Sequence, residues 1–508
     1  MAPERRTLAH PLALCVGGFI LLRVLFFPMA QNYQADSLAR ASLAEHWAER
    51  PHIIRDPNEI YVYGPIHIYT LGASTWLLGR DLGPRLPSLV LGCLLVVPLI
   101  RLARRTGTRH GSAFAVAATA LHSIHIQSST IAASEAVFLT PLLFAADRAL
   151  AMCEEGRLRD AVLCGLCLLF AEGVRYDGWM YAGLIMLVVF WAAWRPWSPG
   201  GARLGAAPLI VLGVLGSVFP LYWMMACVRY RHDLLWVFHA YGAYHQAFAG
   251  EVVARAGANQ FRIQTLLFWP NSLLYTLSPG VLVLGVLGVI RASGMTWARR
   301  LLLVVIVPPI LLTLRAIVLL DFRLIPRFSI IQAIGLTLFI GPGWEALRAW
   351  GARAVHGVLL WVPAVLVPAY ILLWSHGRSG PYPEQLRSIS PLADLPPAVA
   401  GAIDWIHEHR PDRIVVDQNG FAGTAVAAYS GLPEDRVYWV VSWSDHWEKQ
   451  VRTVPPVCAV LFDRGVLGRR VALGSERIEI VGRPYLRKAQ YPAPRYGISA
   501  TIYCQEGL

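Results

Sequence analysis

Charged residues are scarce in this chain and account for only 15% of its 508 residues. A soluble protein has about a quarter of its residues charged, so an ordinary soluble enzyme is excluded. Hydrophobic residues make up 56% of the chain and the mean hydropathy is +0.47, which excludes a disordered protein as well. A bilayer core about 30 Å thick needs roughly 20 apolar residues per helix, and such stretches recur along most of the sequence. We therefore predict a polytopic α-helical membrane protein.

Three further absences narrow the function. Lysine occurs only at Lys449 and Lys488, so arginine carries most of the net charge of +13. Such arginines are typical of loops that stay in the cytoplasm, and we expect no nucleic-acid partner. No glycine-rich phosphate loop follows any predicted strand, which argues against a nucleotide-bound substrate. No internal repeat is evident, although secondary transporters commonly have one.

The eight cysteines do not form a disulfide framework. Six of them lie in or beside apolar stretches. Cys164 and Cys167 have the spacing of a redox pair there, and we interpret them as small-residue packing. Cys458 and Cys504 lie in a polar tail, and they can pair if that tail is in an oxidising compartment.

The positions of the arginines favour one of two membrane topologies. Residues 65–79 form an apolar run of only about 15 residues, which is short for a span. If this run lies along the outer interface, the arginines at 101–109 and those of the later loops all fall inside. We therefore predict eleven spans plus an outer juxtamembrane helix at 65–79, with the N-terminus in the cytoplasm and the tail outside. The spans are expected at residues 12–30, 86–101, 111–127, 135–150, 160–172, 178–194, 205–226, 265–290, 301–320, 328–343 and 357–375.

The composition changes near residue 377, where glycines and prolines are typical of a linker. We predict a transmembrane catalytic domain at residues 1–376 and a small extracytoplasmic α/β domain at 377–508. In the latter, the apolar pattern predicts a helix at 397–409 and strands at 413–417, 437–442 and 457–462.

Charged side chains gather at the predicted outer membrane face, where ionisable groups mark function by default. A carboxylate at this face can take a proton from an acceptor hydroxyl, and arginines can hold a phosphate by forked hydrogen bonds. Each residue also has a structural explanation: a helix cap, a mutual ion pair or an interfacial anchor. The candidates are Asp36, Glu135, Arg175, Asp177, Arg323 and Arg327, with His67 on the juxtamembrane helix and His232, His239, His245, Tyr241 and Tyr244 in the outer loop 227–264.

The order of these residues resembles that of the GT-C glycosyltransferases that use polyprenyl-phosphate sugars. More narrowly, the chain is similar to the protein O-mannosyltransferase and lipid A aminoarabinose transferase superfamily. The matching features, in chain order, are Asp36 after the first span, the Ala-rich helix at 39–47, Tyr-Gly-Pro-Ile at 63–66, Leu-Gly at 78–79, Arg-Leu-Pro-Ser at 85–88, Glu135 after a Ser-rich turn, Arg-Tyr-Asp-Gly at 175–178 and Arg-Phe-Ser at 327–329.

The resemblance implies roles for the candidates and also shows departures. It makes Asp36 the general base, with Glu135 orienting donor or acceptor and the arginines binding the departing phosphate. The acid that pairs with the first Asp in the family is Ser37 here. Tyr63 replaces the metal-ligand Glu of the aminoarabinose branch, so a divalent metal is unsupported. His122 and His125 have metal-ligand spacing, but no carboxylate or Cys accompanies them, and we interpret them as buried, hydrogen-bonded histidines.

We therefore expect a membrane glycosyltransferase, in a bacterial inner membrane, that moves a sugar from a polyprenyl-phosphate donor to a protein, lipid or glycan acceptor. The alternative is a multi-span secondary transporter or lipid flippase. Transporters place ionisable groups near the bilayer midplane, whereas most charges here are expected at one face. A third hypothesis is a sensor or assembly protein with an extracytoplasmic domain.

Overall fold

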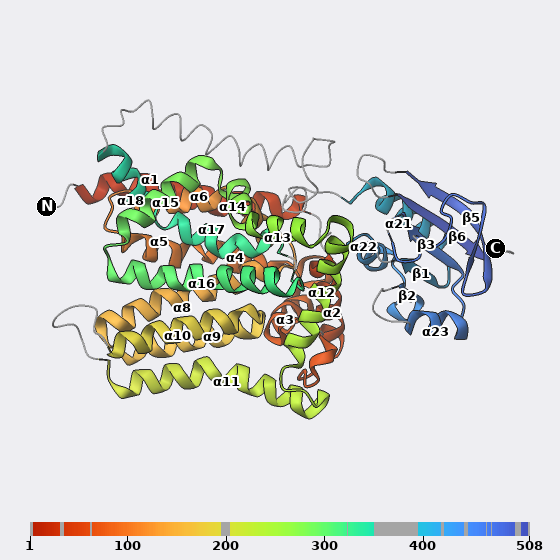
Figure 1. Cartoon of the computed structure of the whole chain (residues 1–508), viewed down its shortest axis with the longest axis horizontal. Coiled ribbons are helices and arrows are strands. Elements are labelled where there is room, and N and C mark those ends of the chain that lie inside the picture. The colour runs from red at the N-terminus through yellow and green to blue at the C-terminus, as the bar shows by residue number, and fades with distance from the viewer. Residues whose placement is uncertain are drawn as a thin grey trace. The chain divides into compact units, whose positions relative to one another are not determined.

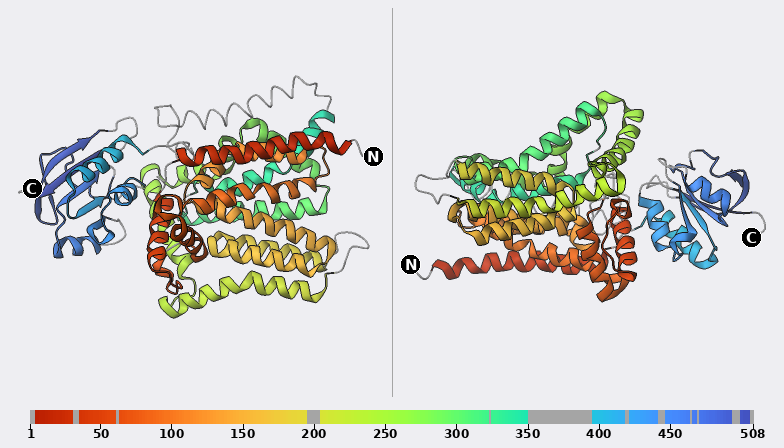
Figure 2. Two further views of the ribbon diagram at one scale, coloured as in Figure 1. Left: turned by 180° about the vertical axis from the view of Figure 1, so that it is seen from behind. Right: turned by 90° about the horizontal axis from the view of Figure 1, so that it is seen from below.

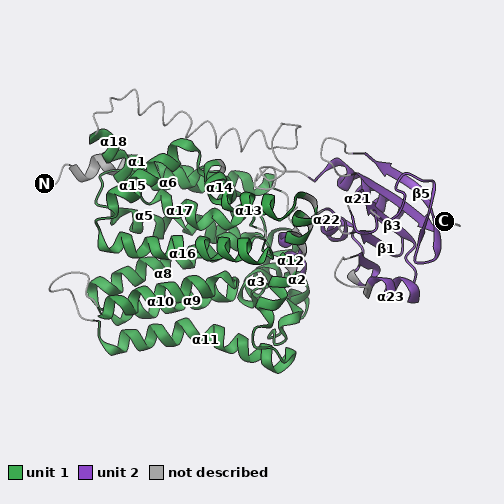
Figure 3. Cartoon of the chain, viewed as in Figure 1, with its two compact units in different colours: residues 1–30, 43–373, 389–391 green, residues 31–42, 374–388, 392–508 purple. Residues whose placement is uncertain are grey.

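The computed structural model describes residues 4–30, 35–60, 63–194, 204–322, 324–349, 395–417, 421–440, 446–463, 465–468, 470–492 and 499–505. The chain divides into two compact units (Figure 3). The first consists of residues 1–30, 43–373 and 389–391, and the second of residues 31–42, 374–388 and 392–508. The predicted span at 357–375, the linker and Arg323 lie outside the described residues.

The first unit is helical, and its long helices run side by side (Figures 1 and 2). Its elements are α1 (Glu4–Met29), the second half of α2 (Ala35–Glu49), η1 (Pro57–Glu59), α3 (Pro65–Leu82), α4 (Leu86–Leu94), α5 (Val96–Arg104), α6 (Gly111–Ala120), α7 (Ser123–Thr130), α8 (Ser134–Glu155), α9 (Leu158–Val174), α10 (Asp177–Trp194), α11 (Ala206–Arg231), α12 (Trp236–Ala256), α13 (Ala258–Leu266), α14 (Phe268–Leu277), α15 (Pro279–Ala292), α16 (Thr296–Leu319), η2 (Pro326–Ser329), α17 (Ile330–Thr337) and α18 (Ile340–Ala349).

Six of the described helical segments are long and apolar enough to cross a membrane. They are α1, the continuous pair α4 and α5, α8, α10, α11 and α16. Two bent helix pairs, α14 with α15 and η2–α17 with α18, bring the number up to eight if each pair counts as one span. α3 is not among these segments, in keeping with the juxtamembrane position predicted for residues 65–79. The predicted span at 111–127 is instead two short helices, α6 and α7, because the second half is polar.

Two glycines bring α3 against the end of α9. A Cβ on Gly64 would lie 2.2 Å from the carbonyl oxygen of Gly173, and a Cβ on Gly173 would lie equally close to Ile66. Only a residue without a side chain tolerates this approach. The contact anchors the end of α9, just before Arg175.

The second unit contains a six-stranded mixed sheet in the order β2-β1-β3-β6-β5-β4. β1 pairs in parallel with β2 and β3, and the remaining pairs are antiparallel. The strands are β1 (Ile414–Asp417), β2 (Val437–Val440), β3 (Cys458–Phe462), β4 (Arg477–Ile480), β5 (Arg483–Tyr491) and β6 (Ala500–Gln505). The helical elements of this unit are α21 (Pro397–His409), α22 (Phe421–Tyr429), η3 (Glu434–Arg436) and α23 (His446–Thr453).

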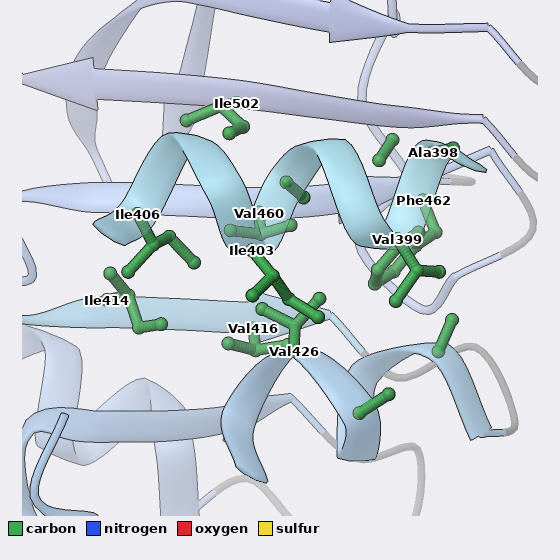
Figure 4. Packing of buried hydrophobic residues seen from close by; sticks show 14 of the residues in the cluster. Ala398, Val399, Ile403, Ile406, Ile414, Val416, Val426, Val460, Phe462 and Ile502 are labelled. Carbon is green, nitrogen blue, oxygen red and sulfur yellow. The ribbon is translucent and has the colours of Figure 1, made fainter. Parts of the chain in front are cut away.

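Helices cover both faces of this sheet. Alternate residues of β1 and β3, such as Val416 and Val460, pack under α21 and α22 (Figure 4). The intervening residues, such as Val415 and Leu461, pack on the other face with Trp447 of α23. The small α/β domain expected from the sequence is confirmed, and its helix and three strands lie within a residue or two of their predicted positions. The three antiparallel strands β4–β6 were not predicted.

Cys458 and Cys504 are directly opposite each other in the β3–β6 register and form a disulfide. The sequence allowed a Cys458–Cys504 disulfide without requiring it, and the structure contains this disulfide. The first residues of α2 also belong to this unit, and Leu38 lies in its hydrophobic core cluster.

Candidate functional site

The site is built at the point where α8 begins, α9 ends and α10 begins. Glu135 lies in the first turn of α8, where the helix dipole favours a negative charge, and its side chain is only 5% exposed. Arg175 follows α9 in an extended conformation, with φ −144° and ψ 138°. Asp177 is the first residue of α10. Three helix ends thus place one cation between two carboxylates.

Arg175 connects these groups. Its Nη1 donates to Oε1 of Glu135 at 2.7 Å and to Oγ of Ser134 at 2.9 Å. Its Nη2 donates to Oδ2 of Asp177 at 2.6 Å. Arg327, on η2, approaches the same Glu135 oxygen, with Nε at 3.8 Å. The structure thus brings together Glu135, Arg175, Asp177 and Arg327, which come from three separate segments of the sequence.

The charges stabilise one another. Burial disfavours the charged form of Arg175, but Asp177 and Glu135 outweigh this effect and raise its pKa above the ordinary value. The guanidinium therefore stays charged throughout the physiological range. Two cations face two carboxylates in the cluster, and Asp177, at 31% exposed, is its most accessible acid.

A pocket next to this cluster has aromatic and aliphatic walls. The four charged residues lie in its lining, and the Arg175 guanidinium is 5.9 Å from the centre of the Phe138 ring. The remaining lining residues come from α8, α10, α14, α16, α17 and the segment around η2: Phe138, Met180, Tyr181, Trp269, Leu312, Phe322, Phe328, Ile330 and Ile331. Such a mixture suits a ligand that has both an anionic and an apolar part.

Residues of the predicted outer loop 227–264 contact the pocket wall. Within this stretch the structure has two helices, α12 and α13. His245 is buried and stacks on Phe322 with ring centres 4.1 Å apart, and Tyr241 is 4.4 Å from His245. His239 instead pairs with Asp233 in an exposed position. The aromatic wall was not predicted, because Phe322 and Phe328 carry no charge that would have singled them out.

Two further candidates, His67 and Asp36, are not among the residues that line this pocket. His67 is buried in α3 and is not in the lining of this pocket. Asp36 lies in the first turn of α2 in the second unit, with its carboxylate 3.9 Å from Nη2 of Arg40. Among the described residues, no three His, Cys, Asp or Glu side chains are grouped as a metal ion would need.

A buried cation in the first span was missed. Arg23 is 0% exposed, and it donates from Nε to Nδ1 of His125 at 3.1 Å and from Nη1 to the Phe19 carbonyl at 2.7 Å. His122 Nδ1 accepts from the backbone N–H of His125. The interpretation of the two histidines as buried and hydrogen-bonded is confirmed. The charge of Arg23 inside an apolar run was the available signal.

Searches among known proteins show what the chain resembles. No family model matches the sequence, and no curated protein matches it. Solved structures do. ArnT from Cupriavidus metallidurans bound to undecaprenyl phosphate is 13% identical, with a TM-score of 0.60 over 96% of this chain and 97% of that one. The apo oligosaccharyltransferase of Archaeoglobus fulgidus is 12% identical, with a TM-score of 0.57 over 89% and 69%. AglB from the same organism, in complex with an inhibitory peptide and a dolichol-phosphate, is 14% identical, with a TM-score of 0.53 over 91% and 70%.

These likenesses establish the fold. The chain is an integral membrane protein with the GT-C fold and a C-terminal sheet domain, as predicted from the sequence.

Proposed function

We propose that the protein is a glycosyltransferase that moves a sugar from a polyprenyl-phosphate donor to an acceptor hydroxyl at the outer membrane face. The observation that carries this proposal is the pocket of the GT-C unit, where Arg175 and Arg327 lie beside aromatic walls. The similar solved structures hold undecaprenyl phosphate in one case and a dolichol-phosphate in another. Both ligands combine an anionic phosphate with a long apolar chain.

Arg175 and Arg327 would bind and neutralise the donor phosphate. The contacts of Arg175 suggest how. Its bond to buried Glu135 holds the guanidinium in place, whereas the more exposed Asp177 is the partner that a phosphate can replace. Arginine suits this task because its planar fork donates two parallel hydrogen bonds to a phosphate.

The chemical step needs a base for the acceptor. In our scheme the acceptor oxygen forms a bond to the anomeric carbon while the bond from that carbon to the phosphate oxygen breaks. The electron pair leaves with the polyprenyl phosphate, and the hydroxyl proton passes to Asp36. Glu135 orients donor or acceptor through its bond to Arg175.

The tail disulfide supports an extracytoplasmic position for the second unit. Disulfides persist in oxidising compartments and are rare in the cytoplasm, so the Cys458–Cys504 pair fits a tail outside a bacterial inner membrane. Cysteine labelling tests this orientation. Asn58→Cys should react with a membrane-impermeant thiol reagent added outside, whereas Arg109→Cys should not; both positions are exposed. The unsubstituted protein, with its own free cysteines, is the control, and outside labelling at 109 would overturn the topology.

Purified protein supplied with a radiolabelled polyprenyl-phosphate sugar pool and candidate acceptors tests the function. Transfer should yield a glycosidic product and free polyprenyl phosphate. Asp36→Asn keeps the size of the side chain but not its basicity, so turnover should fall by about 10²–10⁴-fold with little change in donor binding. An unchanged rate would remove Asp36 as the base. Substrate transport without any glycosidic product would favour a transporter.

A further inference from the structure

The Arg-Leu-Pro-Ser segment at residues 85–88 consists of the N-cap residue of α4 and the first three residues of this helix. The proposed mechanism assigns no role to this segment. We infer that Arg85 and Ser88 are positioning residues that hold the turn before α8, and through it Ser134 and Glu135, against Arg175. This inference rests on the proposed role of Glu135 and Arg175. It adds two residues that contact neither donor nor acceptor.

Arg85 joins the C-terminal ends of two helices. Its Nε donates to the carbonyl of Thr130, the last residue of α7, at 2.8 Å. Its Nη2 donates to the carbonyl of Phe27 near the end of α1, and its guanidinium lies 4.4 Å from the centre of the Phe27 ring. The last carbonyls of a helix have no partner within it and carry partial negative charge. A forked cation satisfies both ends at once.

Ser88 holds the other side of the same turn. Its side chain is fully buried, and its Oγ donates to the carbonyl of Ala133 at 3.0 Å. Ala133 is the N-cap of α8 and has no capping side chain of its own. Within the turn, Ile131 and Ala133 pack on Ala30 at the end of α1. The segment at 85–88 thus grips the turn at residues 130 and 133.

The gripped turn leads directly to the site. Ser134 and Glu135 are the next two residues, and both accept a hydrogen bond from Nη1 of Arg175. A shift of Ala133 moves both acceptors with it, because all three belong to the first turn of one helix. When a group that positions a substrate is displaced by a small distance, much of its contribution to the reaction rate is lost.

The helix that carries Ser88 is itself closely packed. A Cβ on Gly92 would lie 2.2 Å from Oγ of Ser129 on α7. Ser129 Oγ in turn donates to the His125 carbonyl at 2.6 Å. α4 therefore has little freedom to move relative to α7. The hydrogen bonds from Arg85 to Thr130 and from Ser88 to Ala133 hold the turn in a fixed position relative to α4.

The test measures binding of undecaprenyl phosphate and the donor KM in purified protein. Losing bonds from a charged donor should weaken binding in Arg85→Ala by roughly 10- to 100-fold, and losing one neutral bond in Ser88→Ala should weaken it by a few-fold, roughly 3 to 10. Arg85→Lys keeps the charge but places all its donors on one nitrogen, whereas Arg85 reaches the two carbonyls from Nε and Nη2, so it should fall in between. A merely structural defect would lower the amount of active protein without changing KM.

A double-mutant cycle tests whether the effect passes through Glu135. In a Glu135→Gln background, Arg85→Ala should cost at most about threefold more, because coupled residues are not additive. Arg80→Ala is the matched arginine control, since Arg80 forms an exposed ion pair with Glu49. Thr140→Val removes a bond between α8 and the Leu91 carbonyl of α4, away from the turn. Both controls should keep the wild-type affinity.

The outcomes separate the two proposals. If Glu135→Gln and Arg175→Lys leave transfer unchanged, the proposed site fails. If they lower transfer while Arg85→Ala and Ser88→Ala bind undecaprenyl phosphate normally, only the positioning role is wrong. The same conclusion follows if the losses of affinity from Glu135→Gln and Arg85→Ala multiply in full in the double variant. Wild-type affinity in Arg85→Lys would also contradict the two-carbonyl bridge. If Arg85→Ala does not fold, Ser88→Ala and Arg85→Lys decide the question.

Discussion

α8 carries two buried carboxylates, Glu135 in its first turn and Asp147 toward its other end, and both pair with arginines from neighbouring helices. The exposed fractions of their side chains are 5% and 2%. Asp147 binds Nε of Arg101 at 2.7 Å and lies 3.5 Å from Nη2 of Arg105. By charge and burial alone, the two positions look alike.

The arginines differ in what surrounds them. At the Asp147 end, Arg148 continues the network to buried Asp160 at 2.8 Å, and Arg101 is 47% exposed. Arg101 faces outward, whereas Arg148 is as buried as Arg175, and together these cations join α5, α8 and α9. At the Glu135 end, Arg175 is only 13% exposed and lies in the lining of a pocket with aromatic walls.

A buried ion pair is by itself weak evidence for function. Both networks hold helices together. Of these two networks, the one at Glu135 has its charged residues in the lining of a pocket that also has apolar walls.

The largest expected difference between the two ends is in catalysis. Arg175→Ala removes the cation that we assign to the leaving phosphate, so transfer should fall by about 10²-fold or more. Arg148→Ala removes an arginine of similar burial, and transfer per folded molecule should stay within about twofold of wild type. Initial rates with a radiolabelled donor, normalised to folded protein, measure both. Equal losses of transfer in the two variants would contradict the proposed difference between the two ends of α8.

Stability should show the reverse order. Asp147→Asn leaves Arg101, Arg105 and Arg148 facing one another without the buried acid, and unfolding should become easier by about 3 kcal/mol. Thermal unfolding in detergent measures the change. Donor KM should stay as in wild type, and a raised KM would mean that the two ends are coupled.

Arg327 tests how much the forked geometry contributes. Arg327→Ala should weaken binding of polyprenyl phosphate by about tenfold, the value of one charge-assisted hydrogen bond. Arg327→Lys should recover only part of the loss, because an ammonium is a point charge. Full recovery would mean that charge alone matters at this position.

The smallest effect is expected at Tyr176, next to Arg175. Its hydroxyl donates to the Tyr63 carbonyl at 3.0 Å and accepts from Trp223 Nε1 at 2.9 Å. Tyr176→Phe should therefore destabilise the fold by about 1–2 kcal/mol and change donor KM by about twofold at most. Burial raises the pKa of Tyr176 above its usual range. Its neutral hydroxyl should thus contribute equally at every pH below about 10, and unfolding measured across this range checks the constancy.

Particular elements show why some features were predictable. Residues 397–409 have apolar side chains at helical spacing, and β1 and β3 are apolar runs, so local pattern was enough. In β5 only Tyr485 is buried, and the strand offers no such run. The polar residues of α7 are all buried, and a hydropathy pattern merges this helix into a span.

The sequence by itself determined the membrane class, the GT-C resemblance, the α/β tail and the identity of the charged candidates, because each depends on composition, local periodicity or residue order. Only the tertiary structure decided that Glu135, Arg175, Asp177 and Arg327 meet, that Phe322 and Phe328 form the wall beside them, and that Arg85 and Ser88 hold the turn before α8. Such contacts join segments that are tens to hundreds of residues apart. They arise from how helix ends pack, which local patterns do not encode.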